Sequence, residues 1–183
     1  MKKLIKIAAL ISSCSLLCAC GTNMLSPKLP DLDKSLAFSA EVSVNDTLYC
    51  ADFERKGTDS WLISFSSPFS VGGMSLEVNG ANALAAYDGV ETKLDVTDFE
   101  KSPLCAVISS VEEAASNPNG VTASAAQEGV VAQGKAGDLD FTLKLNENGA
   151  PVALEINAIG LFAAISSFEI TGEPVRPDVV GVY

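Results

Sequence analysis

The feature that most constrains the fold is an alternation of apolar with small or polar residues, which begins near residue 36. Its first instance has apolar side chains at every second position: Leu36, Phe38, Ala40, Val42 and Val44. Successive side chains of a β-strand point to opposite faces of a sheet, so this period of two predicts a strand with one buried face. Such a strand needs an apolar layer against that face.

The same pattern recurs along the rest of the chain. The segments with strand character are 36–44, 47–56, 61–65, 74–78, 83–87, 90–96, 121–128, 129–134, 141–145, 152–156 and 161–171. Turn sequences such as Asn79-Gly80 and Asp88-Gly89 separate several of them, and two-residue turns of this type join antiparallel neighbours. The sequence therefore predicts an antiparallel meander of about ten strands.

One segment departs from the period of two and predicts a helix over residues 103–115. Ser102 followed by Pro103 is a recognised helix start, because serine caps the first backbone N–H groups and proline fits the first turn. The apolar residues that follow have helical spacing: Leu104, Val107, Ile108, Val111 and Ala115. Glu112 and Glu113 are expected to face elsewhere.

Together these elements predict a mainly β (α+β) domain. Strands that each have one apolar face cannot form a flat sheet open to water on both sides. We expect a strongly curved antiparallel sheet, that is, an incomplete β-barrel of about ten strands, with the central amphipathic helix covering its concave side. A two-sheet sandwich is the alternative, but it gives the helix no obvious role.

The first 19 residues have the order of an export signal peptide, with a basic start, an apolar run and small residues at the end. The apolar run is too short to cross a bilayer core about 30 Å thick. The segment LCACG at residues 17–21 resembles the lipobox of bacterial lipoproteins, which predicts cleavage before Cys20 and lipidation of that cysteine. Cleavage before Cys14, or ordinary secretory cleavage, is the alternative.

We therefore expect a signal peptide at 1–19, a lipid-anchored spacer at 20–34 and a folded domain at 35–183. Removal of the leader with its three lysines changes the formal net charge from −11 to −14. This acidity disfavours nucleic acid as a partner. The acyl anchor predicts attachment to the extracytoplasmic face of the cell membrane.

After loss of the leader and acylation of Cys20, two cysteines remain, Cys50 and Cys105. Outside the cytoplasm they could form one disulfide, since thiols are oxidised there. Cys50 lies in a predicted strand and Cys105 at the start of the predicted helix, so pairing depends on their distance in the fold. Two buried free thiols are the alternative.

Residues that common catalytic sites require are missing. The sequence contains no histidine, which excludes Ser-His-Asp triads, Cys-His pairs and histidine metal ligands. It has no Gly-x-Ser-x-Gly motif and no phosphate-binding glycine-rich loop with lysine. Most acidic residues fall on the polar side of the predicted strands. We expect no enzyme activity, no cofactor and no metal site.

The segment Trp61 to Pro68 (WLISFSSP), the central helix and the hairpin around Asn148-Gly149 make residues 35–171 resemble the superfamily of LolA/LolB-type lipoprotein carriers. The resemblance implies an incomplete antiparallel barrel with helices closing an apolar concave side. It also implies functions such as carrying acylated proteins or binding lipids. Two departures are the lipobox, which soluble LolA-type carriers lack, and the absence of a clear receptor-type insertion loop with an exposed apolar residue.

We therefore expect a lipid-anchored binding protein that holds a lipid or acylated peptide in an apolar groove, with the helix as a movable lid. The side chains expected to line this groove are Trp61, Phe65, Met74, Leu104, Val107, Ile108, Val111, Phe141 and Phe162. The same residues could equally form a filled core. In that case the chain would be a structural or interaction protein that docks an envelope or germination protein.

Overall fold

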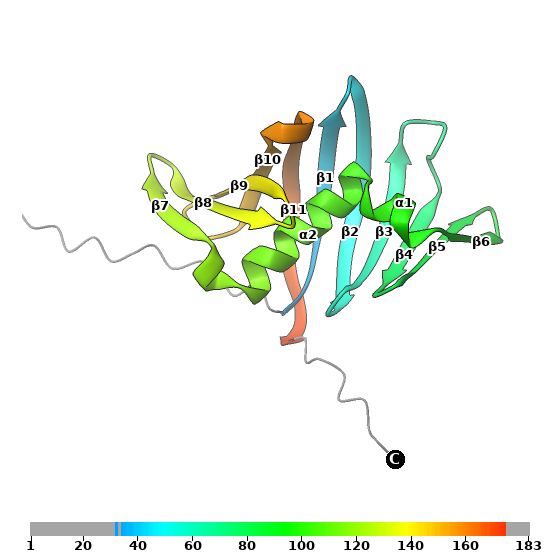
Figure 1. Ribbon diagram of the computed structural model, residues 1–183, viewed down its shortest axis with the longest axis horizontal. Coiled ribbons are helices and arrows are strands. Elements are labelled where there is room, and N and C mark those ends of the chain that lie inside the picture. Colours follow the sequence, from blue (N-terminus) through cyan, green and yellow to red (C-terminus); the bar gives the residue numbers. More distant parts are fainter. Residues whose placement is uncertain (1–31, 33, 175–183) are drawn as a thin grey trace, which may run out of the picture.

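The computed structural model describes residue 32 and residues 34–174. Within these residues one antiparallel sheet has the strand order β6-β5-β4-β3-β2-β1-β11-β10-β9-β8-β7 (Figure 1). The strands are β1 (Lys34–Val44), β2 (Thr47–Gly57), β3 (Ser60–Ser67), β4 (Ser75–Asn79), β5 (Asn82–Tyr87), β6 (Val90–Leu94), β7 (Thr122–Ala126), β8 (Gly129–Ala136), β9 (Leu139–Leu145), β10 (Pro151–Ile156) and β11 (Leu161–Pro174). The helices are α1 (Val96–Glu100) and α2 (Pro103–Ser116), with single 3-10 turns η1 (Pro118–Gly120) and η2 (Asn157–Ile159).

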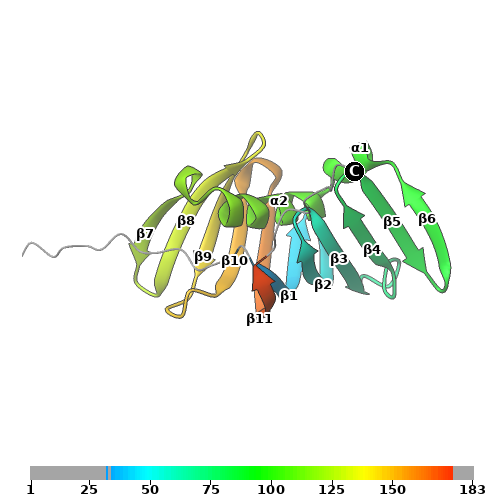
Figure 2. The ribbon, with the colours of Figure 1, turned by 90° about the horizontal axis from the view of Figure 1, so that it is seen from below.

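The chain follows a meander that is interrupted once. Strands β1 to β6 run outward to one edge, the helices then cross the sheet, and β7 to β11 return from the opposite edge until β11 pairs with β1. Because β6 and β7 do not pair with each other, the sheet stays open. Figure 2 shows the sheet bending around the helices, which lie on one face. The predicted curved, incomplete barrel is confirmed, and the two-sheet alternative is wrong.

Most predicted elements agree with the observed ones, with three differences near their ends. The strand predicted over 90–96 ends at Leu94, because Asp95 caps the helix α1 by accepting a hydrogen bond from the Thr97 N–H at 2.9 Å. The sequence analysis did not predict α1. The long helix begins as predicted, with the Ser102 hydroxyl accepting from the Cys105 N–H at 3.1 Å. Finally, β11 continues to Pro174, beyond the predicted end at 171.

The core lies between α2 and the concave face of the sheet. Helix α2 contributes Val107 and Val111, which are at most 2% exposed, and the central strands contribute aromatic rings. Phe38 and Phe53 stack with their ring centroids 4.9 Å apart, and Trp61 meets Phe38 edge-on at 6.2 Å. Burial of this apolar surface is what holds the helix on the sheet.

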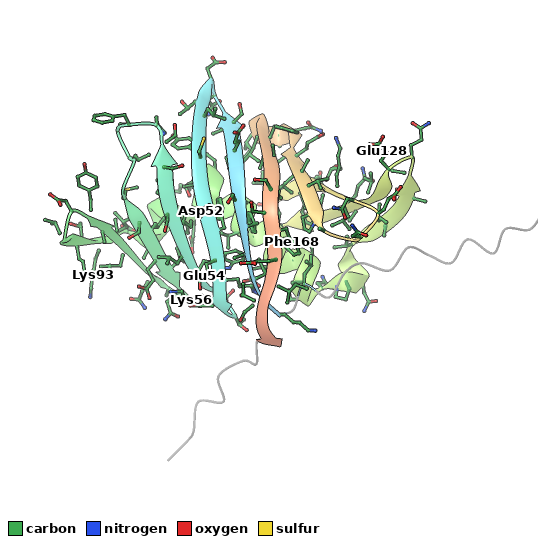
Figure 3. All side chains as sticks on the ribbon, turned by 180° about the vertical axis from the view of Figure 1, so that it is seen from behind. Asp52, Glu54, Lys56, Lys93, Glu128 and Phe168 are labelled. Atoms are coloured by element: carbon green, nitrogen blue, oxygen red, sulfur yellow. The ribbon has the colours of Figure 1, made fainter. Side chains whose placement is uncertain are left out.

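The opposite, outer face of the sheet is polar. On β2 the residues Asp52, Glu54 and Lys56 alternate with buried ones and point to this face (Figure 3). The Ser39 hydroxyl donates a hydrogen bond to Asp52 at 2.6 Å across the strand pair. The period of two thus separates a solvated face from a buried one, as the sequence predicts.

The predicted signal peptide, Cys20 and all of the predicted spacer except Leu32 and Lys34 lie outside the described residues.

Candidate functional site

The residues predicted to line an apolar groove beneath the helix are packed against one another. Six of them belong to the buried core, each at most 6% exposed: Trp61, Phe65, Val107, Ile108, Val111 and Phe141. Met74 and Leu104 are half-buried and pack against this core. The structure therefore places these eight side chains in, or packed against, one apolar core.

Phe162 does not belong to this group. It is 44% exposed and lies on the outer face, because its neighbours Leu161 and Ala163 occupy the buried face of β11. In the sheet Phe162 is opposite Ser43 of β1. Its assignment to the groove is wrong, and the alternation along β11 is the sequence signal that places it outside.

The proposed pairing of Cys50 with Cys105 is also wrong, since both cysteines are free thiols. Cys50 lies opposite Glu41 on the outer face, whereas Cys105 is on α2, which covers the concave face. Burial raises the pKa of the Cys105 thiol, the hydrogen bond with Ser109 lowers it, and the nearby Glu100 carboxylate raises it. The net direction is upward, so this thiol is mainly protonated near neutral pH.

A buried polar cluster joins α2 to β2 and to the start of the described chain. Arg55 is only 4% exposed and its guanidinium donates to both carboxylate oxygens of Glu112, from Nε at 2.9 Å and from Nη2 at 2.6 Å. The Trp61 indole N–H donates to the same carboxylate at 2.7 Å. Arg55 Nη1 also donates to the Leu32 carbonyl oxygen at 2.7 Å.

This cluster changes two expectations. Glu112 was expected to face away from the sheet, yet it reaches the sheet and neutralises Arg55. An α2 that opened as a lid would break the ion pair and remove the counter-charge of Arg55, which is costly. The structure therefore favours a fixed helix. The sequence contains one sign of this cluster. Arg55 continues the alternation of Ala51 and Phe53, which places it on the buried side of β2.

An open groove of about 560 Å³ runs beside α2. Buried apolar side chains form its bottom: Trp61, Val78, Phe99 and Ile108. Four carboxylates lie along it: Asp59, Glu100, Glu112 and Glu113. Only Trp61 and Ile108 belong both to this groove and to the predicted set. The remaining wall comes from the β4–β5 turn and from the β8–β9 turn at Gly137.

The loop between β3 and β4 presents an apolar side chain that the sequence analysis missed. Phe69 is 100% exposed, although phenylalanine normally contributes to a core. The loop is held in shape by backbone hydrogen bonds, including those from the N–H groups of Val71 and Gly72 to the Pro68 carbonyl, both at 2.9 Å. The sequence pattern gave no sign that this loop would expose an apolar side chain.

Residues 32 and 34–174 contain neither of two other kinds of feature, a metal-binding cluster and a membrane-spanning helix. No three His, Cys, Asp or Glu side chains in this part of the chain are grouped so that they could hold a metal ion. No helix in the same part has the length and apolar character needed to cross a bilayer.

Comparison with known proteins gives structural similarity only. No protein-family model and no curated protein matches the chain. A LolA superfamily protein from Nitrosomonas europaea is similar, with a TM-score of 0.38, 11% identity, and coverage of 84% of this chain and 94% of that one. A DUF1329 family protein from Desulfovibrio piger has a TM-score of 0.38 and 10% identity, with coverage of 80% and 87%. These similarities assign neither a family nor a ligand to the chain.

Proposed function

We propose that this chain is a non-enzymatic binding lipoprotein of the bacterial cell envelope, anchored by a lipid at Cys20 to the extracytoplasmic face of the membrane. It binds an apolar part of its ligand, a lipid or acylated peptide, in the groove beside α2. The observation that carries this proposal is the groove itself, which has Trp61, Val78, Phe99 and Ile108 at its bottom.

The groove beside α2 suits this role better than the space beneath the helix. The space beneath is filled by the side chains of the core, and Arg55 and Glu112 hold the helix in place. The groove is open, so a ligand can enter without displacement of α2. Each Å² of apolar surface removed from water contributes about 25 cal/mol, so the affinity depends on how much apolar surface of the ligand the groove covers.

The position of the tether supports the same site. Arg55 contacts both the Leu32 carbonyl, where the described chain begins, and Glu112, which lines the groove. Leu32, twelve positions after Cys20, therefore lies close to the groove. Residues 20–31 can span at most about 40 Å, so an anchor at Cys20 keeps the groove near one membrane.

A groove-filling substitution tests the binding site. The full-length chain with Cys20→Ala, which has no acyl group of its own, is titrated with a fluorescent fatty acid that phospholipid can displace. Ser109→Phe places a ring in the groove and is expected to weaken uptake at least about tenfold. Ser166→Phe on the outer face is the matched control and leaves uptake unchanged. Absence of uptake by the parent chain contradicts the proposal.

The anchor has its own test. In a bacterial host that acylates lipoproteins, Cys20→Ala is expected to abolish incorporation of labelled fatty acid and retention in the membrane fraction. Cys14→Ala is the matched control for the alternative cleavage position and changes neither. Labelling that survives Cys20→Ala overturns the assignment of the anchor.

A second candidate function is an interaction protein with a filled core that docks an envelope protein. The complete exposure of Phe69 favours it, because a large exposed apolar side chain held on an ordered loop is typical of a contact surface. A photo-crosslinker at position 69 tests this candidate in intact cells. A single defined adduct that disappears when the crosslinker is moved to position 166 supports this candidate. If no adduct forms with the crosslinker at position 69, the candidate is contradicted.

A further inference from the structure

The groove beside α2 carries negative charge that none of the described basic residues neutralises apart from Arg55 at Glu112. Asp59, Glu100 and Glu113 form no ion pair with any described residue, whereas Glu112 is paired with Arg55. Among residues 32 and 34–174, those that line the groove include no lysine and no arginine. Three uncompensated carboxylates therefore surround an apolar bottom.

We propose that the part of the ligand held in this groove is a peptide segment that combines apolar side chains with at least two basic residues. This inference rests on the groove being the binding site of the proposed function. The apolar side chains contact the bottom formed by Trp61, Val78 and Ile108, and the basic side chains pair with the carboxylates at the rim. Charge complementarity of this kind selects partners and orients them.

The distribution of the carboxylates favours a peptide over a lipid with one cationic headgroup. Glu100 lies at the end of the groove where α2 begins, and Glu113 lies near the end of α2. The part of α2 that lines the groove, from Cys105 to Ser116, is about 16 Å long at 1.5 Å per residue. A single headgroup can neutralise only one end, whereas basic residues along a peptide can reach both.

The shape of the groove bottom suits short apolar side chains of a ligand. Trp61, Phe99, Ile108 and Val78 are each at most 9% exposed, so each presents only a small apolar surface and the groove has no deep slot. Leucine or isoleucine side chains of a peptide fill such a shallow surface. On the helix side, the Ser116 hydroxyl donates to the Glu112 carbonyl oxygen at 2.7 Å, so it can accept a hydrogen bond from a peptide N–H, and Ser109 adds a second hydroxyl group.

The experiment uses the full-length chain with Cys20→Ala and the fluorescence of Trp61, the single tryptophan, which lies at the bottom of the groove. The probe is a synthetic peptide of about eight residues in which leucine and lysine alternate. At about 3.3 Å per residue, the extended peptide is longer than the groove. Peptides with glutamine or glutamate in place of lysine are the matched ligands. The lysine peptide is expected to bind about tenfold more tightly than the glutamine peptide, and the glutamate peptide is expected not to bind.

Two variants with the same change of net charge separate a local effect from a general one. Asp59→Asn, Glu100→Gln and Glu113→Gln together are expected to reduce binding of the lysine peptide to the level of the glutamine peptide. Asp88→Asn, Glu91→Gln and Glu128→Gln together leave it unchanged, because these residues do not line the groove. Glu128 lies at the far edge of the sheet (Figure 3).

The outcomes are distinct. Equal binding of the lysine and glutamine peptides, or equal losses in both triple variants, overturns the cationic peptide while the apolar groove of the proposed function survives. No response of Trp61 to any peptide, together with no uptake of the fluorescent fatty acid, overturns the groove as well. Binding of the lysine peptide that weakens only in the groove variant supports the inference.

Discussion

The Arg55 guanidinium and the Glu112 carboxylate, 57 positions apart in the chain, meet through two parallel hydrogen bonds of 2.9 and 2.6 Å. Arg55 is 4% exposed and Glu112 14%, so the pair lies largely out of water. The same guanidinium holds the Leu32 carbonyl at 2.7 Å. One side chain of β2 thus connects the helix, the sheet and the segment that precedes β1.

We expect Glu112→Gln to lower the free energy of unfolding by about 3 kcal/mol, because it leaves the buried Arg55 without a counter-charge. Urea denaturation followed by far-UV circular dichroism measures the change. Glu113→Gln, one position along the same helix, is the control. Its carboxylate accepts a hydrogen bond from the Asn117 side chain at an exposed site. Similar losses in both variants would contradict the role of the buried pair.

The indole N–H of Trp61 gives a second prediction. Trp61→Phe keeps an aromatic ring in the core but removes the donor to Glu112, and we expect a loss of about 1–2 kcal/mol in the free energy of unfolding. If the loss comes from this hydrogen bond, it becomes smaller when Glu112 is already replaced by alanine. Strictly additive losses in the double variant would show that the ring volume alone matters.

Gly129 is expected to tolerate no side chain. Its φ is +102°, and an added Cβ would lie 2.0 Å from the Leu145 carbonyl oxygen in the strand pair β8–β9. Gly129→Ala should therefore lower the free energy of unfolding by roughly 2 kcal/mol or more, through backbone strain and a lost strand contact. Gly57→Ala, whose Cβ would be 3.4 Å from that of Ser60, should change it by less than about 0.5 kcal/mol.

Phe69 and Phe65 form a matched pair four positions apart. Phe65 is 5% exposed and belongs to the core, so Phe65→Ala should cost about 3–5 kcal/mol in thermal or urea unfolding. Phe69→Ala should leave stability within about 0.5 kcal/mol, since the side chain loses no contact with the core. The Phe69 variant should instead elute earlier from a hydrophobic-interaction column. Equal destabilisation by both substitutions would mean that Phe69 is buried in solution.

Cys50 and Cys105 should both react with an alkylating agent once the chain is unfolded, without prior reduction. Mass spectrometry counts the alkyl groups that the two thiols have taken up. In the folded chain, alkylation of Cys105 should rise with pH through a midpoint above that of a solvent-exposed thiol, because burial favours the protonated form and raises the pKa of Cys105. Glu100→Gln removes a nearby negative charge and should move this midpoint downward. A midpoint below that of a small solvent-exposed thiol measured under the same conditions, or a Cys50–Cys105 disulfide, would contradict the structure.

The sequence by itself determined the strands, their buried faces and the long helix. Alternation in 36–44 places Leu36, Phe38 and Val42 on one face, and a strand can satisfy that pattern in only one way. Ser102 and Pro103 determine where α2 begins, through a local cap. The curvature of the sheet around one helix followed because the apolar faces needed a cover.

Pattern alone was less reliable where β11 is irregular. Ser167 has a positive φ of 52°, and the register of β1 against β11 shifts between Ala37 and Ser39. An extra residue in one strand changes which face later side chains occupy, so Ile165 and Phe168 both pack toward the core although they are three positions apart. Before this irregularity, the plain alternation already placed Phe162 on the outer face.

Only the tertiary structure decided what lies against what. Arg55 could be assigned to the buried side of β2 from its neighbours, but its partners Glu112 and Leu32 come from other parts of the chain. The helix connection between β6 and β7 also decides which residues face the groove, because it carries α2 across the sheet. Local periodicity records the face on which a side chain lies, whereas ion pairs, thiol distances and grooves depend on contacts between segments distant in sequence.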